Sequence, residues 1–381
     1  MPGAYVSKMQ ANDFALWDEM QNQRMPLGFE LELTARCNIN CRHCYINLPA
    51  ADFTVQSKEL SYLQIKRYID QAASLGVMWC LLTGGEPLLR KDFCAIYRYL
   101  CKKGIFVQVF TNATLISQIH IELFKKNMPR DLEVTVYGAT KETYEMVTRT
   151  PGAFAAFKRG IALLRTNKIP FRLKAVIMRS NLAEAEAIQN FCEKYTEDYY
   201  RFDPFLQLRL DGDRHRNEEI RSERLLPEEI VALEMRNAAR KKALFNLSKT
   251  CVDLQAFPQG AREEKRGNIF FCTAGKGSFA ISYDGFFRIC SSLCTPQCDY
   301  ELKKGSLREA YQKHYYKIIS LRSDNPDFLQ KCASCPILFL CQWCPGRAFS
   351  ETNALDGFTQ YYCEVAHARA ARQGIKIVLK E

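Results

Sequence analysis

A repeated alternation of short apolar runs with longer helical segments constrains the fold of this chain more than any other feature. Residues 29–33 alternate apolar and polar side chains, as a half-buried strand does. Similar strand signals recur downstream, and helical patterns separate them. The strands are expected at residues 29–33, 77–82, 105–111, 132–137, 171–178 and 202–208, and the helices at 60–73, 92–102, 116–125, 153–167 and 183–193.

Six βα units in succession predict an α/β fold with a parallel sheet and right-handed crossovers. Such a sheet either closes partly into a barrel or stays open and doubly wound, and in both cases active sites lie at the carboxyl ends of the strands. After the last unit the chain becomes charged and helical, and then rich in Cys. The expected divisions are an N-terminal extension with a helix near residues 14–20 (1–27), a barrel (28–210), a helical bridge (211–250) and a Cys-rich domain (251–381).

Cysteine is unusually frequent, with 17 residues in a chain of 381. The N-terminus lacks the basic-then-apolar pattern of a signal peptide, and no apolar run is long enough to span a membrane. We therefore expect a cytoplasmic protein without membrane contact, in which cysteines bind metal or clusters rather than form disulfides. The net charge of +11 is spread along the chain, which favours a mildly basic surface over a dedicated nucleic-acid site.

Three cysteines follow the first predicted strand in the spacing C-x3-C-x2-C: Cys37, Cys41 and Cys44. Three thiolates can hold three irons of a [4Fe–4S] cubane and leave the fourth iron open, whereas closed electron-transfer clusters use four Cys. An open iron can bind a small chelating ligand, as an open zinc site does. Zinc is the competing interpretation and would need a fourth ligand. His43 lies between two of the cysteines and is poorly placed to complete a tetrahedron.

This loop, including the aromatic Tyr45 after the last Cys, resembles the signature of the radical S-adenosylmethionine (SAM) superfamily. The resemblance implies a partial (β/α)6 barrel of the TIM type. It also implies that the open iron chelates the amino and carboxylate groups of SAM. An electron from the cluster then cleaves SAM to a 5′-deoxyadenosyl radical, which abstracts hydrogen from the substrate. An electron donor such as flavodoxin or ferredoxin is implied as a partner.

Other strand ends resemble the SAM-binding positions of the same superfamily. The run Gly84-Gly85-Glu86-Pro87 resembles the GGEP motif that holds the methionine amino group, and its glycines let the backbone approach a ligand closely. Later strand ends supply polar side chains that resemble contacts to the nucleoside or the carboxylate. The expected SAM-contacting residues are Tyr45, Gly84, Gly85, Glu86, Asn112, Thr135, Arg149 and Lys174. No catalytic residue is predicted.

A second group of cysteines occupies the C-terminal region. The pattern is C-x12-G-x4-C, then C-x2-C-x5-C-x2-C and a last Cys, made by Cys272, Gly285, Cys290, Cys332, Cys335, Cys341, Cys344 and Cys363. The x5 gap is much shorter than the gap of a zinc ribbon. The pattern resembles the SPASM extension of peptide-modifying radical SAM enzymes. It departs from that family at Cys344, which the family spacing would place one residue later.

The SPASM resemblance implies two auxiliary [4Fe–4S] clusters besides the SAM-binding one. The first would be held by Cys332, Cys335, Cys341 and Cys363, and the second by Cys272, Cys290 and Cys344. For the fourth ligand of the second cluster the alternatives are a position left open for substrate, Cys251, Cys294 and Cys298. The cysteines on apolar strand and helix positions are expected to be core thiols: Cys80, Cys94, Cys101 and Cys192.

The SPASM-like pattern favours an enzyme that modifies a peptide or protein side chain. Residues 1–27 are too short for the separate leader-binding domain of many such enzymes. Either a delivery protein brings the substrate, or the barrel and the Cys-rich domain recognise it directly. Two alternatives stay open. A radical SAM enzyme acting on RNA or a small metabolite would account for the positive charge, and a zinc-binding interaction protein would be colourless.

Overall fold

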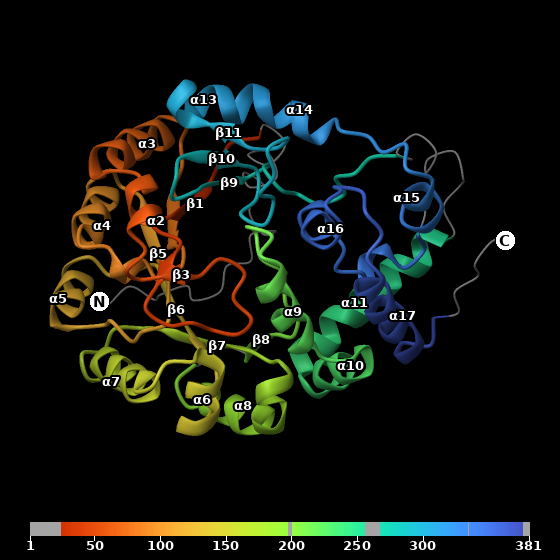
Figure 1. The fold of residues 1–381 in the computed structure, drawn as a ribbon, viewed down its shortest axis with the longest axis horizontal. Coiled ribbons are helices and arrows are strands. Elements are labelled where there is room, and N and C mark those ends of the chain that lie inside the picture. Colours follow the sequence, from red (N-terminus) through yellow and green to blue (C-terminus); the bar gives the residue numbers. More distant parts are fainter. Residues whose placement is uncertain (1–23, 197–199, 256–266, 334, 376–381) are drawn as a thin grey trace, which may run out of the picture.

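The computed structural model describes residues 24–196, 200–255, 267–333 and 335–375, so the helix expected near residues 14–20 lies outside the described part. One sheet organises the chain, with the strand order β11-β10-β9-β1-β4-β5-β6-β7-β8, and it curves into an arc (Figure 1). Its strands are β1 (Gly28–Glu32), β4 (Trp79–Thr83), β5 (Phe106–Thr111), β6 (Asp131–Val136), β7 (Arg172–Val176), β8 (Arg201–Asp203), β9 (Ser278–Ile281), β10 (Phe286–Arg288) and β11 (Tyr300–Glu301). A separate pair is formed by β2 (Arg36–Cys37) and β3 (Leu48–Pro49).

The strands from β1 to β8 pair in parallel with their neighbours, which confirms the predicted partial (β/α)6 barrel. Helices cover the convex face of the arc, and the concave face turns towards the C-terminal region (Figure 1). The helices of this part are α2 (Phe53–Lys58), α3 (Tyr62–Ser74), α4 (Phe93–Lys102), α5 (Gln118–Lys126), α6 (Lys141–Thr148), α7 (Ala153–Thr166) and α8 (Ala185–Glu193). Sequence periodicity had not indicated α2 or α6, which are short.

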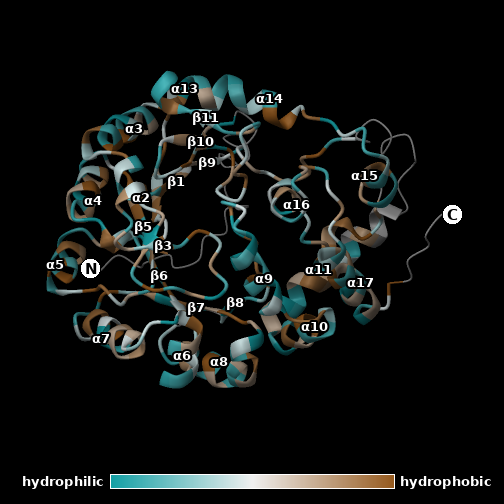
Figure 2. Cartoon of the chain, in the orientation of Figure 1, coloured by the Kyte–Doolittle hydropathy of each residue, from teal (hydrophilic) through white to brown (hydrophobic). Residues whose placement is uncertain are grey.

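The covering helices form where the sequence supplies both a cap and an apolar stripe. At the start of α3, Ser61 and Gln64 make a reciprocal capping box, because the Gln64 amide donates to the Ser61 hydroxyl and the Ser61 amide donates to the Gln64 side chain. The same helix buries Ile65 and Ile69 against the sheet. Hydrophobic and hydrophilic residues accordingly lie side by side on α3, α4 and α7 in Figure 2.

The sheet does not stop at the end of the barrel. Strand β9 pairs in parallel with β1, in the register Gly28 to Ser278 through Leu31 to Ile281, and β10 and β11 follow antiparallel. The rings of Phe29 and Phe279 stack with centroids 5.5 Å apart. The domain division at residue 251 therefore stays a prediction, and the sheet and its core run across it.

The remaining helices are α9 (Arg214–Ser222), α10 (Pro227–Arg236), α11 (Ala238–Gln255), α13 (Leu307–Glu309), α14 (Tyr315–Ile319), α15 (Pro326–Lys331), α16 (Pro345–Thr352) and α17 (Gln360–Arg372). Of these, α13 and α14 continue the outer layer beside α3, and the others stand on the open side of the arc (Figure 1). A buried ion pair fastens α17 to α10, because the Arg369 guanidinium donates to both Glu234 oxygens at 2.5 and 2.9 Å. No helix among the described residues is long and apolar enough to cross a membrane.

Candidate active site

The carboxyl ends of the parallel strands open into a cavity of about 900 Å³. The loop after β1 forms one wall, and neighbouring strands contribute side chains. Thr83 of β4, Phe110 of β5 and Thr135 of β6 lie at or near the strand ends, and Lys174 comes from the middle of β7. Segments of the C-terminal region complete the wall with Ser292, Gln342 and Arg347. The cavity thus lies at the barrel edge where the sequence places the special loops.

The three cysteines of the first loop all line this cavity. Cys37 and Cys41 are buried, and Cys44 is half-buried. Burial is the main cause that raises the pKa of the Cys37 and Cys41 thiols, and the neighbouring thiolates raise it further. These buried thiols therefore resist ionisation, although the charge of Arg216 works to lower the pKa of Cys41, and a bound metal cluster would supply positive charge that favours the thiolates. This donor set fits a cluster with three cysteine ligands.

Two arginines from beyond β8 hold the cysteine loop in place. Arg216 Nη2 donates to the Cys41 carbonyl at 2.8 Å, and Arg209 Nη1 donates to the carbonyl and side-chain oxygens of Asn47 at 3.1 and 3.0 Å. A backbone bond from the Leu210 amide to the Tyr45 carbonyl, 3.0 Å long, adds a further tie. The charged segment after the barrel therefore has a role in fixing the loop that the sequence did not reveal.

Gly84 and Gly85 bring the end of β4 against the cysteine loop. The Gly85 amide donates to the Thr34 carbonyl at 2.7 Å, and the Glu86 amide donates to the Arg36 carbonyl at 3.0 Å. A Cβ atom on Gly84 would lie 2.2 Å from the Thr34 oxygen, and its φ of +131° also favours glycine. Both glycines line the cavity, so a small ligand can reach backbone groups here.

The Glu86 side chain is fully buried and does not line the cavity. Its carboxylate accepts from the Asn112 amide and the Thr111 hydroxyl, each at 2.8 Å, and from the Leu88 amide at 3.1 Å. Burial raises the pKa of Glu86 to about 7, although these hydrogen bonds lower it. In the structure Glu86 joins the ends of β4 and β5.

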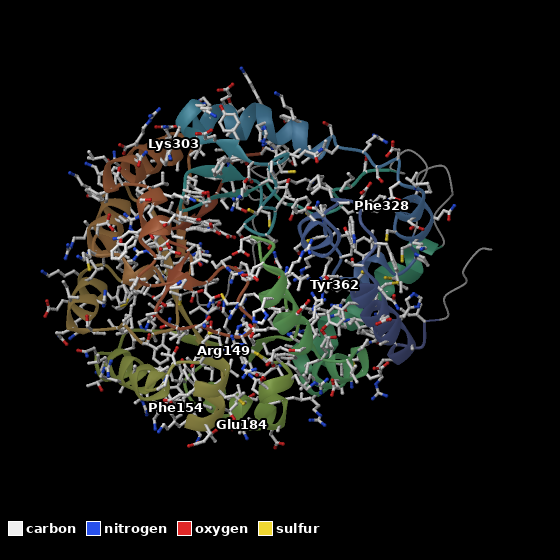
Figure 3. All side chains as sticks on the ribbon, in the orientation of Figure 1. Arg149, Phe154, Glu184, Lys303, Phe328 and Tyr362 are labelled. Carbon is white, nitrogen blue, oxygen red and sulfur yellow. The ribbon has the colours of Figure 1, made fainter. Side chains whose placement is uncertain are left out.

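The other residues expected to contact SAM divide into two groups. Tyr45, Asn112, Thr135 and Lys174 line the cavity, as the two glycines do. Arg149, labelled in Figure 3, does not: it ends α6 in the left-handed region and donates to Glu219 of α9 at 2.6 Å. The SAM contacts remain predictions for all of these residues.

Four C-terminal cysteines surround a second, small cavity of about 30 Å³: Cys332, Cys335, Cys341 and Cys363. Burial raises the pKa of Cys341 to about 11 and of Cys332 to about 12, and neighbouring thiolates raise both further. Cys251 lies in the same apolar cluster as Cys335 and Cys341. The group predicted for the first auxiliary cluster is therefore brought together by the fold.

The cysteines predicted for the second auxiliary cluster also come together. Burial raises the pKa of the Cys290 thiol, and Cys344 and Cys272 lie close enough to raise it further. Cys294 faces elsewhere, towards Arg288, whose charge partly offsets a burial that raises the Cys294 pKa to about 11. Cys251 lies beside Cys335 and Cys298 is buried, and the fourth ligand of the second cluster stays a prediction with the same alternatives.

The zinc alternative requires His43 as a ligand. The imidazole is packed against Tyr137 with ring centroids 5.5 Å apart, and its Nδ1 has no hydrogen-bond partner in the part of the chain that the structure describes. Burial and the charge of Arg216 lower the pKa of His43 to about 4, so the ring is neutral. Among the described residues no three His, Cys, Asp or Glu side chains converge on one metal ion. Ligands of different irons in a cubane need not converge on one point, because each binds its own iron.

Sequence reasoning missed much of the cavity wall. Arg201 and Asp203 of β8, Arg240 of α11 and Arg347 of α16 all line it. The strand predicted at 202–208 begins within β8. The alternation of side chains along a strand could have indicated that Arg201 and Asp203 face the cavity. No sequence pattern connects Arg240 with Arg347, because more than a hundred residues separate them.

Comparison with known proteins supplies a family for this geometry. Residues 31–192 match the model of the radical SAM superfamily. The chain is 27% identical to an AdoMet-dependent heme synthase of Methanosarcina barkeri, over 84% of this chain and 92% of that protein. It is 30% identical to the antilisterial bacteriocin subtilosin biosynthesis protein AlbA of Bacillus subtilis, over 50% of this chain and 44% of AlbA. The fold resembles that of Streptococcus suis SuiB bound to S-adenosylmethionine, with a TM-score of 0.60 and 16% identity, over 91% of this chain and 80% of SuiB.

Proposed function

Because the chain is an enzyme of the radical SAM superfamily, we propose that it modifies a side chain of a peptide or protein. The observation that carries this proposal is the pair of C-terminal cysteine groups that the fold brings together, one around the small second cavity and one around Cys290. Relatives that act on peptides also support it, among them the PqqA peptide cyclase of Granulibacter bethesdensis. We place this activity in the cytoplasm, where thiols stay reduced.

The enzyme uses a [4Fe–4S] cluster and SAM, and Cys37, Cys41 and Cys44 are the residues that would hold the cluster. When bound, this group supplies the electron that cleaves SAM reductively and so starts radical chemistry. The protein's own residues position the ligand. Gly84 and Gly85 leave room beside the cysteine loop, while Arg209 and Arg216 keep the loop in one conformation.

The auxiliary cysteines belong to the same proposal. Cys332, Cys335, Cys341 and Cys363 would hold one cluster, while Cys272, Cys290 and Cys344 would hold a second. Ser292 and Gln342 are close in sequence to Cys290, Cys341 and Cys344, and both line the central cavity. An auxiliary cluster on the second set would therefore stand near the substrate. A flavodoxin or ferredoxin would deliver electrons, and a separate protein could deliver the peptide.

The test is anaerobic reconstitution with iron, sulfide, SAM and a reductant, followed by chromatography for 5′-deoxyadenosine. The parent is expected to form it, Cys41→Ala is expected to form none, and Cys94→Ser on the outer helix α4 is expected to behave as the parent. Iron analysis should show separate losses for Cys335→Ala and Cys290→Ala. If the parent binds iron and sulfide but releases no 5′-deoxyadenosine with any substrate, the assignment is wrong.

A small metabolite is the second candidate substrate. Its support is the alignment with the Methanosarcina barkeri heme synthase, which covers far more of this chain than the alignment with AlbA does. Mass spectrometry of candidate peptides and of candidate metabolites after turnover separates the two proposals. A SAM-dependent mass change in peptides alone supports the first, and a change in the metabolite alone supports the second.

A further inference from the structure

We propose that the substrate of this enzyme presents a carboxylate group, and that Arg240 and Arg347 bind it at the end of the cavity formed by α11 and α16. The inference rests on the proposed function, because it assumes that the cavity receives the substrate. It goes further by naming the charge of the substrate and the residues that select it.

The two arginines are built into the wall in similar ways. Arg240 donates to the Phe202 carbonyl at 2.6 Å, and its guanidinium carbon lies 5.1 Å from the centre of the Phe202 ring. Arg347 donates to the Gln342 carbonyl at 2.9 Å and lies over the ring of Tyr362, 5.3 Å from its centre. Tyr362 is labelled in Figure 3, beside α17 and α16. Backbone carbonyls and ring faces thus hold each guanidinium.

Neither guanidinium has a carboxylate partner among the described residues. The other two cations of the wall differ in this respect. Lys174 and Arg201 lie 2.6 and 2.5 Å from the two oxygens of Glu133, whose side chain is fully buried. Glu133 itself does not line the cavity, and Asp203 is the one acid among the described lining residues, so the four cations exceed Glu133 and Asp203 together by two charges. Among these four cations, Arg240 and Arg347 are the two without a carboxylate in contact in the described part of the chain.

The position of both arginines within their helices points to a ligand. Arg240 is the third residue of α11, which begins at Ala238, and Arg347 is the third residue of α16, which begins at Pro345. A cation in the first turn of a helix is unfavourable, because the helix dipole already places positive charge there. Two helices that break this rule at the same position, and towards the same cavity, concentrate positive potential on it. Departures of this kind are expected at functional sites.

A carboxylate on an organic body fits this environment. The guanidinium group offers parallel N–H donors that match the two oxygens of a carboxylate. Free amide groups at helix starts favour anions as well. Phe202, Phe205 and Gln342 share the lining with the two arginines, so an apolar or amide-bearing body can pack beside the charged group. An Asp or Glu side chain of a peptide and the propionate of a tetrapyrrole present this same chemistry.

Binding to the reconstituted holoenzyme with SAM tests the inference in two arms. One arm uses a pool of short peptides that contain Asp and Glu, and a matched pool with Asn and Gln. The other uses heme, the tetrapyrrole named for the Methanosarcina barkeri relative, and its dimethyl ester. The acidic member of one arm is expected to bind the parent at least about tenfold more tightly than its neutral match, as one charge-assisted hydrogen bond allows. The arm that responds identifies the source of the carboxylate.

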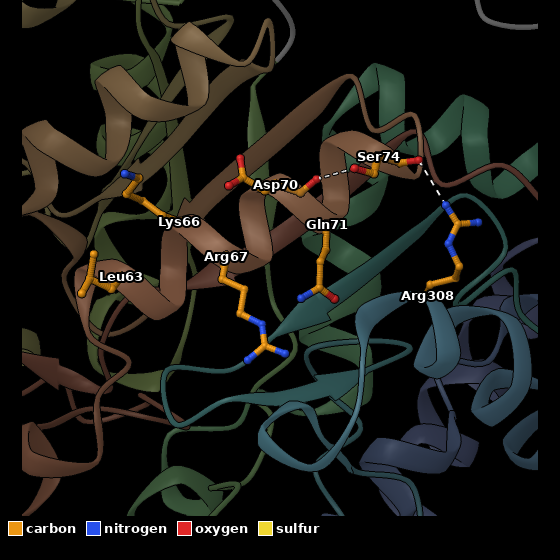
Figure 4. Close-up of a pocket in the computed structure, with 7 residues that line it drawn as sticks. All are labelled: Leu63, Lys66, Arg67, Asp70, Gln71, Ser74 and Arg308. Atoms are coloured by element: carbon orange, nitrogen blue, oxygen red, sulfur yellow. Dashed lines mark hydrogen bonds between the residues drawn. The ribbon is translucent and has the colours of Figure 1, made fainter.

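The variants are Arg240→Gln, Arg347→Gln and Arg347→Lys. Each Gln variant is expected to lose about tenfold of the preference for the acid, and the Lys variant is expected to retain part of it because it keeps the charge. Arg67→Gln is the matched control. Arg67 lies on α3 at a hollow outside the barrel that it shares with Asp70 and Arg308 (Figure 4), and this variant should bind as the parent does.

Two results would overturn the inference: no preference for either acid by the parent, or an undiminished preference in both Gln variants. Iron content is measured in parallel, because Arg347 follows Cys344 closely. If Arg347→Gln loses iron, the result for Arg240→Gln tests the inference, because the hydrogen bonds of Arg240 involve no cysteine. Release of 5′-deoxyadenosine shows whether the carboxylate inference or the proposed function has failed. If SAM cleavage persists without carboxylate preference, the inference alone is wrong, whereas absent cleavage in the parent contradicts the proposed function.

Discussion

Gly85→Ala is the substitution that most directly tests the geometry of the strand end proposed to bind SAM. A Cβ atom at this position would lie 2.4 Å from the Arg36 carbonyl oxygen and 2.7 Å from the Ala35 oxygen. Ordinary van der Waals contact begins at 3.4 Å, so the loop backbone must withdraw by about 1 Å at Arg36. The Arg36 carbonyl also accepts the Glu86 amide at 3.0 Å, and this hydrogen bond would be lost or weakened.

The expected cost follows from these contacts. Forcing one methyl group into a packed site destabilises a protein by about 1–3 kcal/mol. Displacement of a reacting group by about 1 Å can reduce a rate by about a hundredfold. Because Arg36 directly precedes Cys37, the displacement reaches the first of the three cysteines proposed to hold the cluster. We therefore expect Gly85→Ala to fold with a lowered melting temperature and to release 5′-deoxyadenosine about a hundredfold more slowly than the parent.

The assay is anaerobic release of 5′-deoxyadenosine, with the iron content and the electron paramagnetic resonance spectrum of the reduced protein recorded on the same samples. Gly277→Ala serves as the control, because a Cβ atom there meets nothing within 4 Å and the backbone needs no left-handed φ. It should match the parent. A Gly85→Ala enzyme with the parent's rate and spectrum would show that the strand end does not position the cysteine loop.

Two further predictions concern the frame that surrounds the site. Glu234→Gln should lower the free energy of unfolding by about 3–5 kcal/mol, because it leaves the buried Arg369 guanidinium without its charge partner. Urea unfolding checks this, and a paired change to Leu and Met at the two positions should cost less. Glu184 (Figure 3) is half-buried; burial works to raise its pKa, but hydrogen bonds from Thr140 and Thr143 outweigh this and lower it. Its contribution to stability, about 1 kcal/mol after allowance for solvent, is present above the ordinary Glu pKa and is lost as pH falls through the depressed one. Unfolding of the parent and Glu184→Gln across a pH series should therefore show a difference that disappears in acid, and a constant difference would contradict the mechanism.

The C-terminal extension of the sheet shows one limit of sequence reasoning. The pattern of alternating strands and helices ends before Cys251, and β9 to β11 are only two to four residues long. Such short strands carry little periodicity. Pairing between β1 and β9 joins residues that are 250 positions apart, for example Gly28 and Ser278. It becomes evident only once the chain has folded.

The role of Glu86 illustrates a different limit. The motif around Gly84 and Gly85 can be found in the sequence because close backbone approach needs glycine, and both residues do line the cavity. The sequence could not indicate that the carboxylate of Glu86 turns away from the cavity, towards Thr111 and the Asn112 amide. Side-chain direction at a strand end depends on which donors the next strand offers.

By itself, the sequence determined the succession of strands and helices of a parallel α/β sheet and the cysteine loop at the end of its first strand. These features follow from local periodicity and from ligand spacing, which a short stretch of chain carries in full. The closure into a partial barrel and the grouping of the C-terminal cysteines were expected only from the resemblance to a known family. Only the tertiary structure decided which charges face the cavity. Arg240 and Arg347 stand on separate helices, and Lys174 and Arg201 share the single carboxylate of Glu133 from a third strand. The sign of the potential that a substrate meets is a sum over residues distant in sequence, and the fold alone brings them together.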